Sequence, residues 1–197
     1  MITINTLSLT DCSKLSANQA EAMRYLGVKD PDTALVELYQ KCEKEIYDIA
    51  SPKAVYIKSD ITLDCDAVDF GFMRVQSKNL AKNLCGCKEA YVFCATLGIG
   101  LDRHFEKLSA ISQSRATVFS ATASSLIESF CDYVNKELVG QKESRPRFSC
   151  GYGDFSIEHQ VDILKVLEAD KRLGVYLTDS FMMVPVKTVT AIIGIRS

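Results

Sequence analysis

The chain has 197 residues, a net charge of −2, a hydrophobic fraction of 47% and a charged fraction of 24%. These values are typical of a globular protein with a substantial core, and the small net charge excludes a basic surface for nucleic acid or an anionic membrane. No apolar run approaches the ~20 residues of a membrane span, and the N-terminus lacks the regions of an export signal. We therefore expect a cytoplasmic protein with no nucleic-acid or membrane partner.

The N-terminal segment predicts one edge strand and two helices. Apolar residues alternate at the start of the chain, as in an edge strand. A short helix over residues 18–26 ends at Gly27. Asp30 followed by Pro31 forms a helix start, a capping acid with proline at the first helical position, and this predicts a helix over 31–49.

The next segment predicts extended structure and then a strand that leads into a helix. Residues 54–74 carry β-branched side chains two or four positions apart. A short helix over 77–84 and a buried strand over 89–96 follow. Gly98 and Gly100 then precede a helix. This pair admits either an anion at the helix N-terminus or a simple tight turn, because it lacks the third glycine of a dinucleotide fingerprint.

The longest helical pattern covers residues 116–139 and ends at Gly140. Small residues along it allow another backbone to approach closely. Glu128 lies on this helix, and the local pattern alone predicts a solvated side chain.

Beyond a central loop, the C-terminal segment predicts one helix and two strands. Ser156 is a suitable cap for a helix that ends at Gly174. The β-rich tail is interrupted at Pro185, which we place at a bend or an edge. Helices and strands do not alternate regularly, and no linker appears, so residues 1–197 are expected to form a single α+β domain.

Eight cysteines without an export signal indicate a reducing compartment rather than a disulfide framework. Cys85, Cys87 and Cys94 are conceivable metal ligands, but their spacing is not that of a common zinc site. His104 and His159 are the only histidines. We predict no metal site, and cysteines that pack as small apolar side chains.

The most unusual stretch is the loop over residues 145–160, R-P-R-F-S-C-G-Y-G-D-F-S-I-E-H-Q. Pro146 fixes its own φ, and Gly151 allows a positive φ or a close approach of the backbone. Arg147 offers a planar fork of donors that matches a carboxylate, and Tyr152 a flat apolar face with a polar tip. These groups suit a small, flat ligand with a carboxylate. The alternative is a connecting loop with a surface arginine.

Four motifs in the second half occur in the order of a known family. They are a helix of the A-x-x-L-x-E-x-F-x-x-Y type at 123–133, R-F-S-C-G-Y at 147–152, a helix of the L-x-x-x-E type over 164–174, and L-T-D-S-F-M-M-V-P at 177–185. Over residues 121–195 the chain thus resembles the activation (S-adenosylmethionine-binding) domain of cobalamin-dependent methionine synthase. That resemblance implies an α+β domain with a mostly antiparallel twisted sheet flanked by helices.

The resemblance also implies a function in methionine biosynthesis. The module would bind S-adenosylmethionine and present it for reductive methylation of cob(II)alamin to methylcobalamin. Segments that bind cobalamin, folate or homocysteine are not seen, so we expect a separate subunit with methyltransferase activity only beside partners. These partners are a cobalamin-binding methionine synthase subunit and an electron donor such as a flavodoxin or ferredoxin. The alternative is a non-catalytic S-adenosylmethionine- or corrinoid-protein-binding module that serves another corrinoid methyltransferase.

The matched positions imply the ligand contacts. Arg147 would pair with the methionine carboxylate, and Tyr152 would pack against the nucleoside. The backbones of Ser149 and Gly151 would bond the adenine or ribose edge, and Glu128 would face the α-amino group or the incoming corrin. No catalytic residue is expected, because the sulfonium methyl is already electrophilic. The predicted binding residues are Arg147, Phe148, Ser149, Cys150, Gly151, Tyr152 and Glu128.

Overall fold

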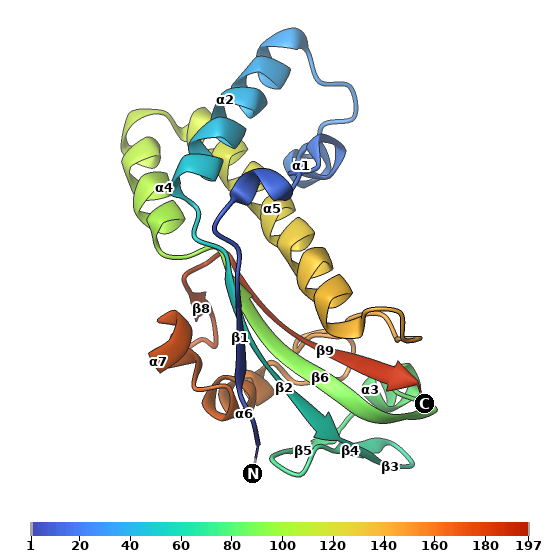
Figure 1. The fold of residues 1–197 in the computed structure, drawn as a ribbon. Helices are drawn as coiled ribbons and strands as arrows, with labels where there is room; N and C mark the ends of the chain where they lie inside the picture. The colour runs from blue at the N-terminus through green and yellow to red at the C-terminus, as the bar shows by residue number, and fades with distance from the viewer. Residues whose placement is uncertain (1, 197) are drawn as a thin grey trace.

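The main sheet has four antiparallel strands in the order β1-β2-β6-β9, in a computed structural model that describes residues 2–196. Figure 1 shows the long strands twisting together, with the final strand at one edge. The predicted α+β class with an antiparallel sheet is therefore confirmed. The strands are β1 (Asn5–Ser8), β2 (Lys53–Asp60), β6 (Cys87–Thr96) and β9 (Thr188–Arg196).

One face of this sheet packs against the larger helices. Alternate residues such as Phe93 and Ile193 point into a core that also holds Phe119, Leu126 and Phe130 from the longest helix. Figure 1 shows α1, α2 and α4 gathered at one end of the long strands, with α5 running from there along the sheet. These helices are α1 (Gln19–Leu26), α2 (Thr33–Ile49), α4 (Gly100–Ile111) and α5 (Gln113–Val139).

The opposite face is covered by short elements, so the central strands are buried on both sides. Val92 and Ile192, the neighbours of the residues above, point into a second core with Leu80, Phe155 and Leu167. Burial on both faces explains why β6 is a nearly continuous apolar run. The short elements are η1 (Cys12–Lys14), β3 (Thr62–Asp64), β4 (Ala67–Asp69), β5 (Arg74–Gln76), α3 (Lys78–Asn83), η2 (Ile157–His159), α6 (Gln160–Val166), α7 (Ala169–Leu173), β7 (Tyr176–Leu177) and β8 (Met183–Val184).

Two predicted helix boundaries are wrong for local reasons. The second helix begins at Thr33 rather than at Pro31, because the Asp32 carboxylate accepts a hydrogen bond from the Leu35 N–H at 2.8 Å. The predicted helix from Ser156 to Gly174 is interrupted at Glu168. This residue has a φ of +48°, which no α-helix accommodates, so α6 and α7 are separate.

The C-terminal tail forms three strands rather than two. β7 and β8 pair as a small two-stranded sheet before β9 joins the main sheet. Pro185 lies at the bend between β8 and β9, as predicted, and follows a cis peptide bond.

Within residues 2–196, no helix has both the length and the apolar character needed to span a bilayer. The eight cysteines are all free thiols. Cys94 is completely buried and Cys85 is exposed. In the described part of the chain, no group of three or more His, Cys, Asp or Glu side chains is arranged to hold a metal ion.

Candidate functional site

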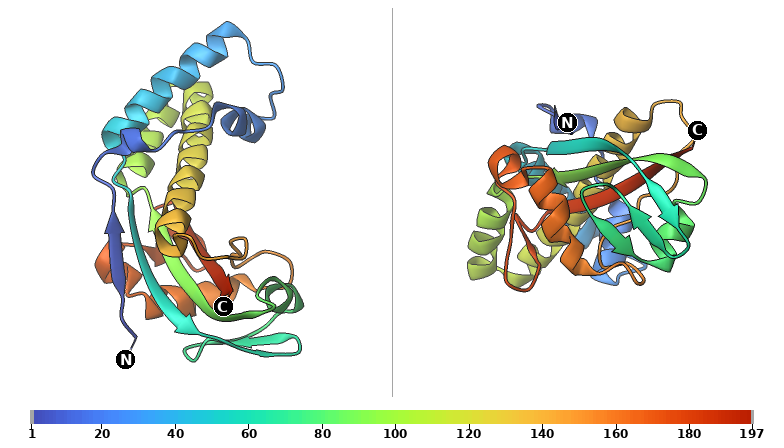
Figure 2. Two further views of the ribbon diagram at one scale, coloured as in Figure 1. Left: turned by 45° about the vertical axis from the view of Figure 1, so that its right-hand side comes forward. Right: turned by 90° about the horizontal axis from the view of Figure 1, so that it is seen from below.

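The 145–160 loop lies along the free edge of the main sheet. The Arg145 N–H donates to the Gly194 carbonyl at 2.8 Å. Phe148 exchanges two backbone hydrogen bonds with Ile192, at 3.0 and 2.9 Å. The loop thereby covers part of the outer edge of β9, and its first half has a fixed register relative to the sheet. Figure 2 shows the loop beside β9 after it leaves α5.

The second half of the loop is tied to α3. The Asp154 carboxylate accepts hydrogen bonds from the Lys78 N–H at 2.8 Å, the Asn79 N–H at 3.2 Å and the Ser77 hydroxyl. It thus satisfies donors at the start of a helix that lies 75 residues earlier in the sequence. Within the loop, the Gly151 N–H donates to the Phe155 carbonyl at 2.8 Å. Residues 151–155 therefore form a tight turn clamped to α3.

We predict that Asp154→Ala loosens this turn and weakens any ligand held by the loop. The Ser77 hydroxyl, with the Asn79 and Lys78 N–H groups, lowers the pKa of Asp154 below its ordinary value of 3.8. A carboxyl with a lowered folded-state pKa stabilises above its ordinary value, and the stabilisation is lost as the pH falls through the folded-state pKa. The wild type should therefore lose this contribution only below about pH 4.

Unfolding followed from pH 7 to pH 2 should show that the stability difference between Asp154→Ala and the wild type shrinks in this acid range. Asp170→Ala is the control, because it removes an aspartate that lies in a different helix, α7, and not in the loop. A difference that stays constant down to the most acid pH would exclude the capping role.

A cavity of about 390 Å³ lies between the loop, α5 and the start of β9. This is within the usual size range of small-molecule sites. Its walls combine a guanidinium, a carboxylate, an amide, hydroxyls and apolar side chains. The lining residues are Glu128, Arg147, Ser149, Cys150, Tyr152, Gln160, Met183, Thr188, Val189 and Thr190.

Arg147 is held by two acids of α5. Its Nη2 donates to Glu128 Oε2 at 3.1 Å, and its Nη1 lies 2.9 Å from Asp132 Oδ1. Nη1 is buried, and the geometry to Asp132 does not make a hydrogen bond, so this donor has no hydrogen-bond partner among the described residues. Glu128 and Asp132 are one helical turn apart and therefore share a face of α5. The guanidinium is thus oriented at the cavity wall by two ion pairs, and its Nη1 donates no hydrogen bond to the described residues.

Glu128 is not the solvated helix residue that the local pattern predicts. It lines the cavity and is only partly exposed. Burial raises the pKa of Glu128 above its ordinary value, and the Arg147 guanidinium opposes this rise. The tertiary contact with the loop is what changes its environment.

The remaining predicted residues take different positions. Tyr152 is 67% exposed at the mouth of the cavity and offers its ring to a ligand. Cys150 is buried in the wall, and burial raises the pKa of its thiol to about 12, which suits a packing role. Phe148 and Gly151 do not line the cavity. Phe148 packs against Phe155, with ring centroids 6.3 Å apart, and the Gly151 N–H is already donated within the turn.

Several lining residues were not predicted from the sequence. Gln160 is 5% exposed, and its Oε1 has no hydrogen-bond partner among the described residues. A buried amide oxygen without a partner is uncommon and favours a ligand or water nearby. Met183 belongs to the L-T-D-S-F-M-M-V-P motif, but the motif alone does not predict a ligand contact for it. Thr188, Val189 and Thr190 line the cavity from the start of β9, and no motif in the local sequence indicates this.

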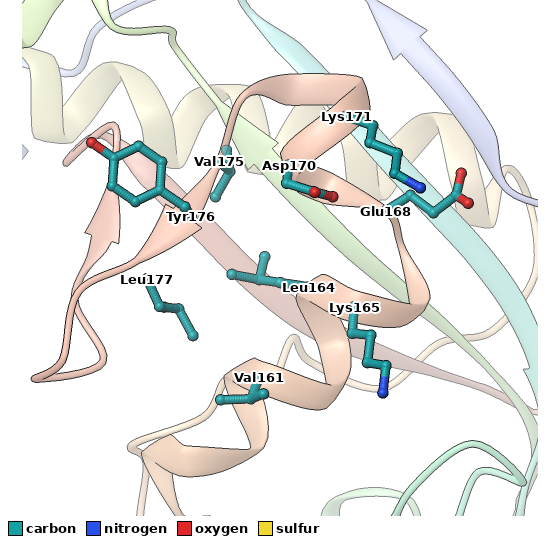
Figure 3. A pocket seen from close by; sticks show the side chains of 9 residues that line it. All are labelled: Val161, Leu164, Lys165, Glu168, Asp170, Lys171, Val175, Tyr176 and Leu177. Carbon is teal, nitrogen blue, oxygen red and sulfur yellow. The ribbon is translucent and has the colours of Figure 1, made fainter.

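A depression of about 430 Å³ between α6, α7 and β7 involves none of the predicted binding residues. Figure 3 shows Leu164 and Leu177 directed toward the gap, with the Tyr176 ring directed away from it. Its charged residues, such as Glu168 and Lys171, lie at one side. The cavity beside α5 is therefore the better candidate for the site that the loop motif predicts.

Comparison with solved structures finds the MetH reactivation domain bound to AdoHcy, with a TM-score of 0.72. The alignment covers 98% of this chain and 78% of that chain, at 13% sequence identity. No family profile and no curated protein matches the sequence. The structural likeness confirms the predicted activation-domain-like fold.

Proposed function

We propose that this chain binds S-adenosylmethionine in the cavity between α5 and the 147–152 loop, and presents its methyl group to a corrinoid carried by a separate protein. One observation carries the proposal. The predicted ligand residues that line this cavity do so in a fold of which a solved example binds AdoHcy. They are Glu128, Arg147, Ser149, Cys150 and Tyr152.

The charges at the cavity complement this ligand. Arg147 lies between Glu128 and Asp132, so the cluster has one negative charge in excess. S-adenosylmethionine carries a carboxylate, an ammonium and a sulfonium, and therefore one net positive charge. The ligand carboxylate would bond the Nη1 donor of Arg147, and its ammonium would pair with Glu128. Glu128 would thus pair with Arg147 in the free protein and with both Arg147 and the ligand ammonium in the complex.

The other walls suit the nucleoside. Tyr152 would cover the adenine with its exposed ring, and the buried Gln160 amide would bond a polar group of the base or ribose. When bound, S-adenosylmethionine supplies an electrophilic methyl group that needs no general base. The residues of this chain would therefore act by binding and orienting.

The charge argument predicts that Glu128→Gln weakens S-adenosylmethionine more than AdoHcy. Both ligands carry the ammonium that would pair with Glu128, so both should bind more weakly. Only S-adenosylmethionine also carries the sulfonium charge, which adds to its loss, while the substitution preserves the side-chain shape. Because this ion pair is partly exposed, we expect the affinity for S-adenosylmethionine to fall about two- to fivefold, and to fall less at high salt. Calorimetry with both ligands at two salt concentrations measures this. Glu137→Gln is the control, because Glu137 is an exposed acid of the same helix that does not line the cavity. Equal losses for both ligands would refute a contribution from the sulfonium charge, and no loss for either ligand would refute the pairing of Glu128 with the ammonium.

The function is tested in two steps. Calorimetry should first show saturable binding of S-adenosylmethionine to the wild-type chain, and absence of binding would overturn the whole proposal. The chain is then mixed with a cobalamin-dependent methionine synthase that lacks its own activation domain, S-adenosylmethionine and reductant. Faster loss of the cob(II)alamin absorbance than with the synthase alone is the expected result. Binding without acceleration would leave a binding module that serves another corrinoid protein.

A further inference from the structure

A second, larger cavity lies beside the N-terminal half of α5. Its volume is about 650 Å³, and its walls come from the first turns of α4, the N-terminal half of α5 and the connection between β8 and β9. It shares no lining residue with the first cavity. Most of its wall is apolar, but an acid and a lysine line it as well. The apolar side chains include Leu101, Phe105, Phe119, Val184 and Val186.

The lysine, Lys187, is a partly buried cation without a carboxylate partner. Its Nζ donates to Ser120 Oγ at 3.1 Å and to Ser124 Oγ at 2.8 Å. Among residues 2–196 it forms no ion pair, although burial lowers its pKa. An ammonium has three N–H donors, so one of them is not used by these hydroxyls. A partly buried cation without an ion-pair partner favours a bound anion.

The acid, Asp102, is in a related situation. Its Oδ2 accepts a hydrogen bond from the Val186 N–H at 2.9 Å. In the described part of the chain it has no ion-pair partner, and burial raises its pKa. Asp102 and Lys187 line the same cavity and attract each other electrostatically, but they are too far apart to form an ion pair. The two opposite charges are therefore available at separate points of one apolar space. Arg103 and Glu106 also line it and add one charge of each sign.

We propose that this second cavity binds an α-amino acid with an apolar side chain. The ligand carboxylate would accept the unused N–H of Lys187, and its ammonium would pair with Asp102. The side chain would lie against Phe105 and Phe119. A simple carboxylate would leave Asp102 unpaired, and an uncharged apolar molecule would leave both charges unpaired. A zwitterion with an apolar tail satisfies all three parts of the wall.

The inference does not depend on the proposed function, and ligand analogues test it directly. L-Leucine and L-methionine are titrated into the wild-type chain by calorimetry. Leucinamide lacks the carboxylate, and 4-methylpentanoate lacks the ammonium. We expect L-leucine or L-methionine to bind saturably at up to millimolar concentration, and each truncated analogue to bind at least about tenfold more weakly than L-leucine. No binding of either amino acid, or equal affinity for 4-methylpentanoate and L-leucine, would overturn the proposal.

Matched variants assign the site. Lys187→Met and Asp102→Asn should each weaken amino-acid binding at least about tenfold. Lys165→Met removes a lysine outside this cavity and should have no effect. Arg145→Ala removes an arginine that lines neither cavity and should also have no effect. Because Asp102 and Lys187 do not line the first cavity, their variants separate the two sites. Unchanged amino-acid affinity in Asp102→Asn or Lys187→Met would exclude the assignment. The analogue series remains decisive if a variant fails to fold.

Discussion

Arg147→Ala is expected to weaken S-adenosylmethionine binding by about ten- to a hundredfold, the effect of losing a charge-assisted hydrogen bond of about 1.5–3 kcal/mol. Two features of the Arg147 contacts both predict weaker ligand binding in this variant. The buried Nη1 donor would no longer be available to the ligand carboxylate. Glu128 and Asp132 would also lose the cation between them and would repel that carboxylate. Calorimetry on the wild type and the variant measures the change.

Two further variants separate this role from general effects on the loop. Arg145→Ala removes a second arginine of the same loop, which donates to the Cys85 carbonyl at 2.6 Å and does not line the cavity. Its effect on affinity should be small. Arg147→Lys keeps the charge without the planar fork, and should give an intermediate affinity. An unchanged affinity in Arg147→Ala, with thermal unfolding intact, would remove Arg147 from the site.

Much of the fold follows from local chemistry in the sequence. Asn18 and Ser77 cap their helices with side-chain oxygens, and Gly27 ends a helix with a φ of +71°. These signals act within a few residues, and so the sequence alone predicts them. The strand near residues 89–96 is also evident, because burial on both faces requires an unbroken apolar run.

The remaining features depend on contacts that are distant in sequence. The break at Glu168 is a backbone conformation that the local sequence does not predict. The residues that mark the end of a helix, Lys171, Arg172 and Gly174, follow only later in the chain. The Arg147 motif suggests an anion, but its two acidic partners lie on a helix 15 to 19 residues earlier. Their one-turn spacing is a signal for a shared cation, although not for its identity. Nothing near Gln160 in the sequence indicates that its amide is buried at the cavity.

Gly153→Ala is expected to give the second large effect, a loss of both stability and ligand affinity, because Gly153 lies where the loop contacts α3. A Cβ at this position would lie 2.2 Å from Asn79 Nδ2 and 3.1 Å from Asn79 Cγ, on a backbone with a φ of +57°. Overpacking of this kind typically lowers the free energy of unfolding by about 1–3 kcal/mol, in addition to about 1 kcal/mol for the left-handed backbone. Rotation of the Asn79 side chain can relieve the contact with Nδ2, but Asn79 Cβ also lies 3.3 Å from the added atom, so the turn has to shift by a few tenths of an ångström relative to α3. The loop that carries Tyr152 would then be displaced, and S-adenosylmethionine affinity should fall with stability.

Two comparisons distinguish the clash from backbone strain. Gly174 has a φ of +69°, and an added Cβ there meets nothing within 4 Å, so Gly174→Ala reports strain alone. Asn79→Ala removes both of the nearest atoms. The double variant should therefore recover much of the stability and affinity that Gly153→Ala loses, a non-additive result expected of residues in contact. Denaturant unfolding and calorimetry of the wild type and the four variants measure both quantities. If Gly153→Ala and Gly174→Ala were equally destabilised, or if Asn79→Ala gave no rescue, contact with α3 would not be what positions the ligand loop.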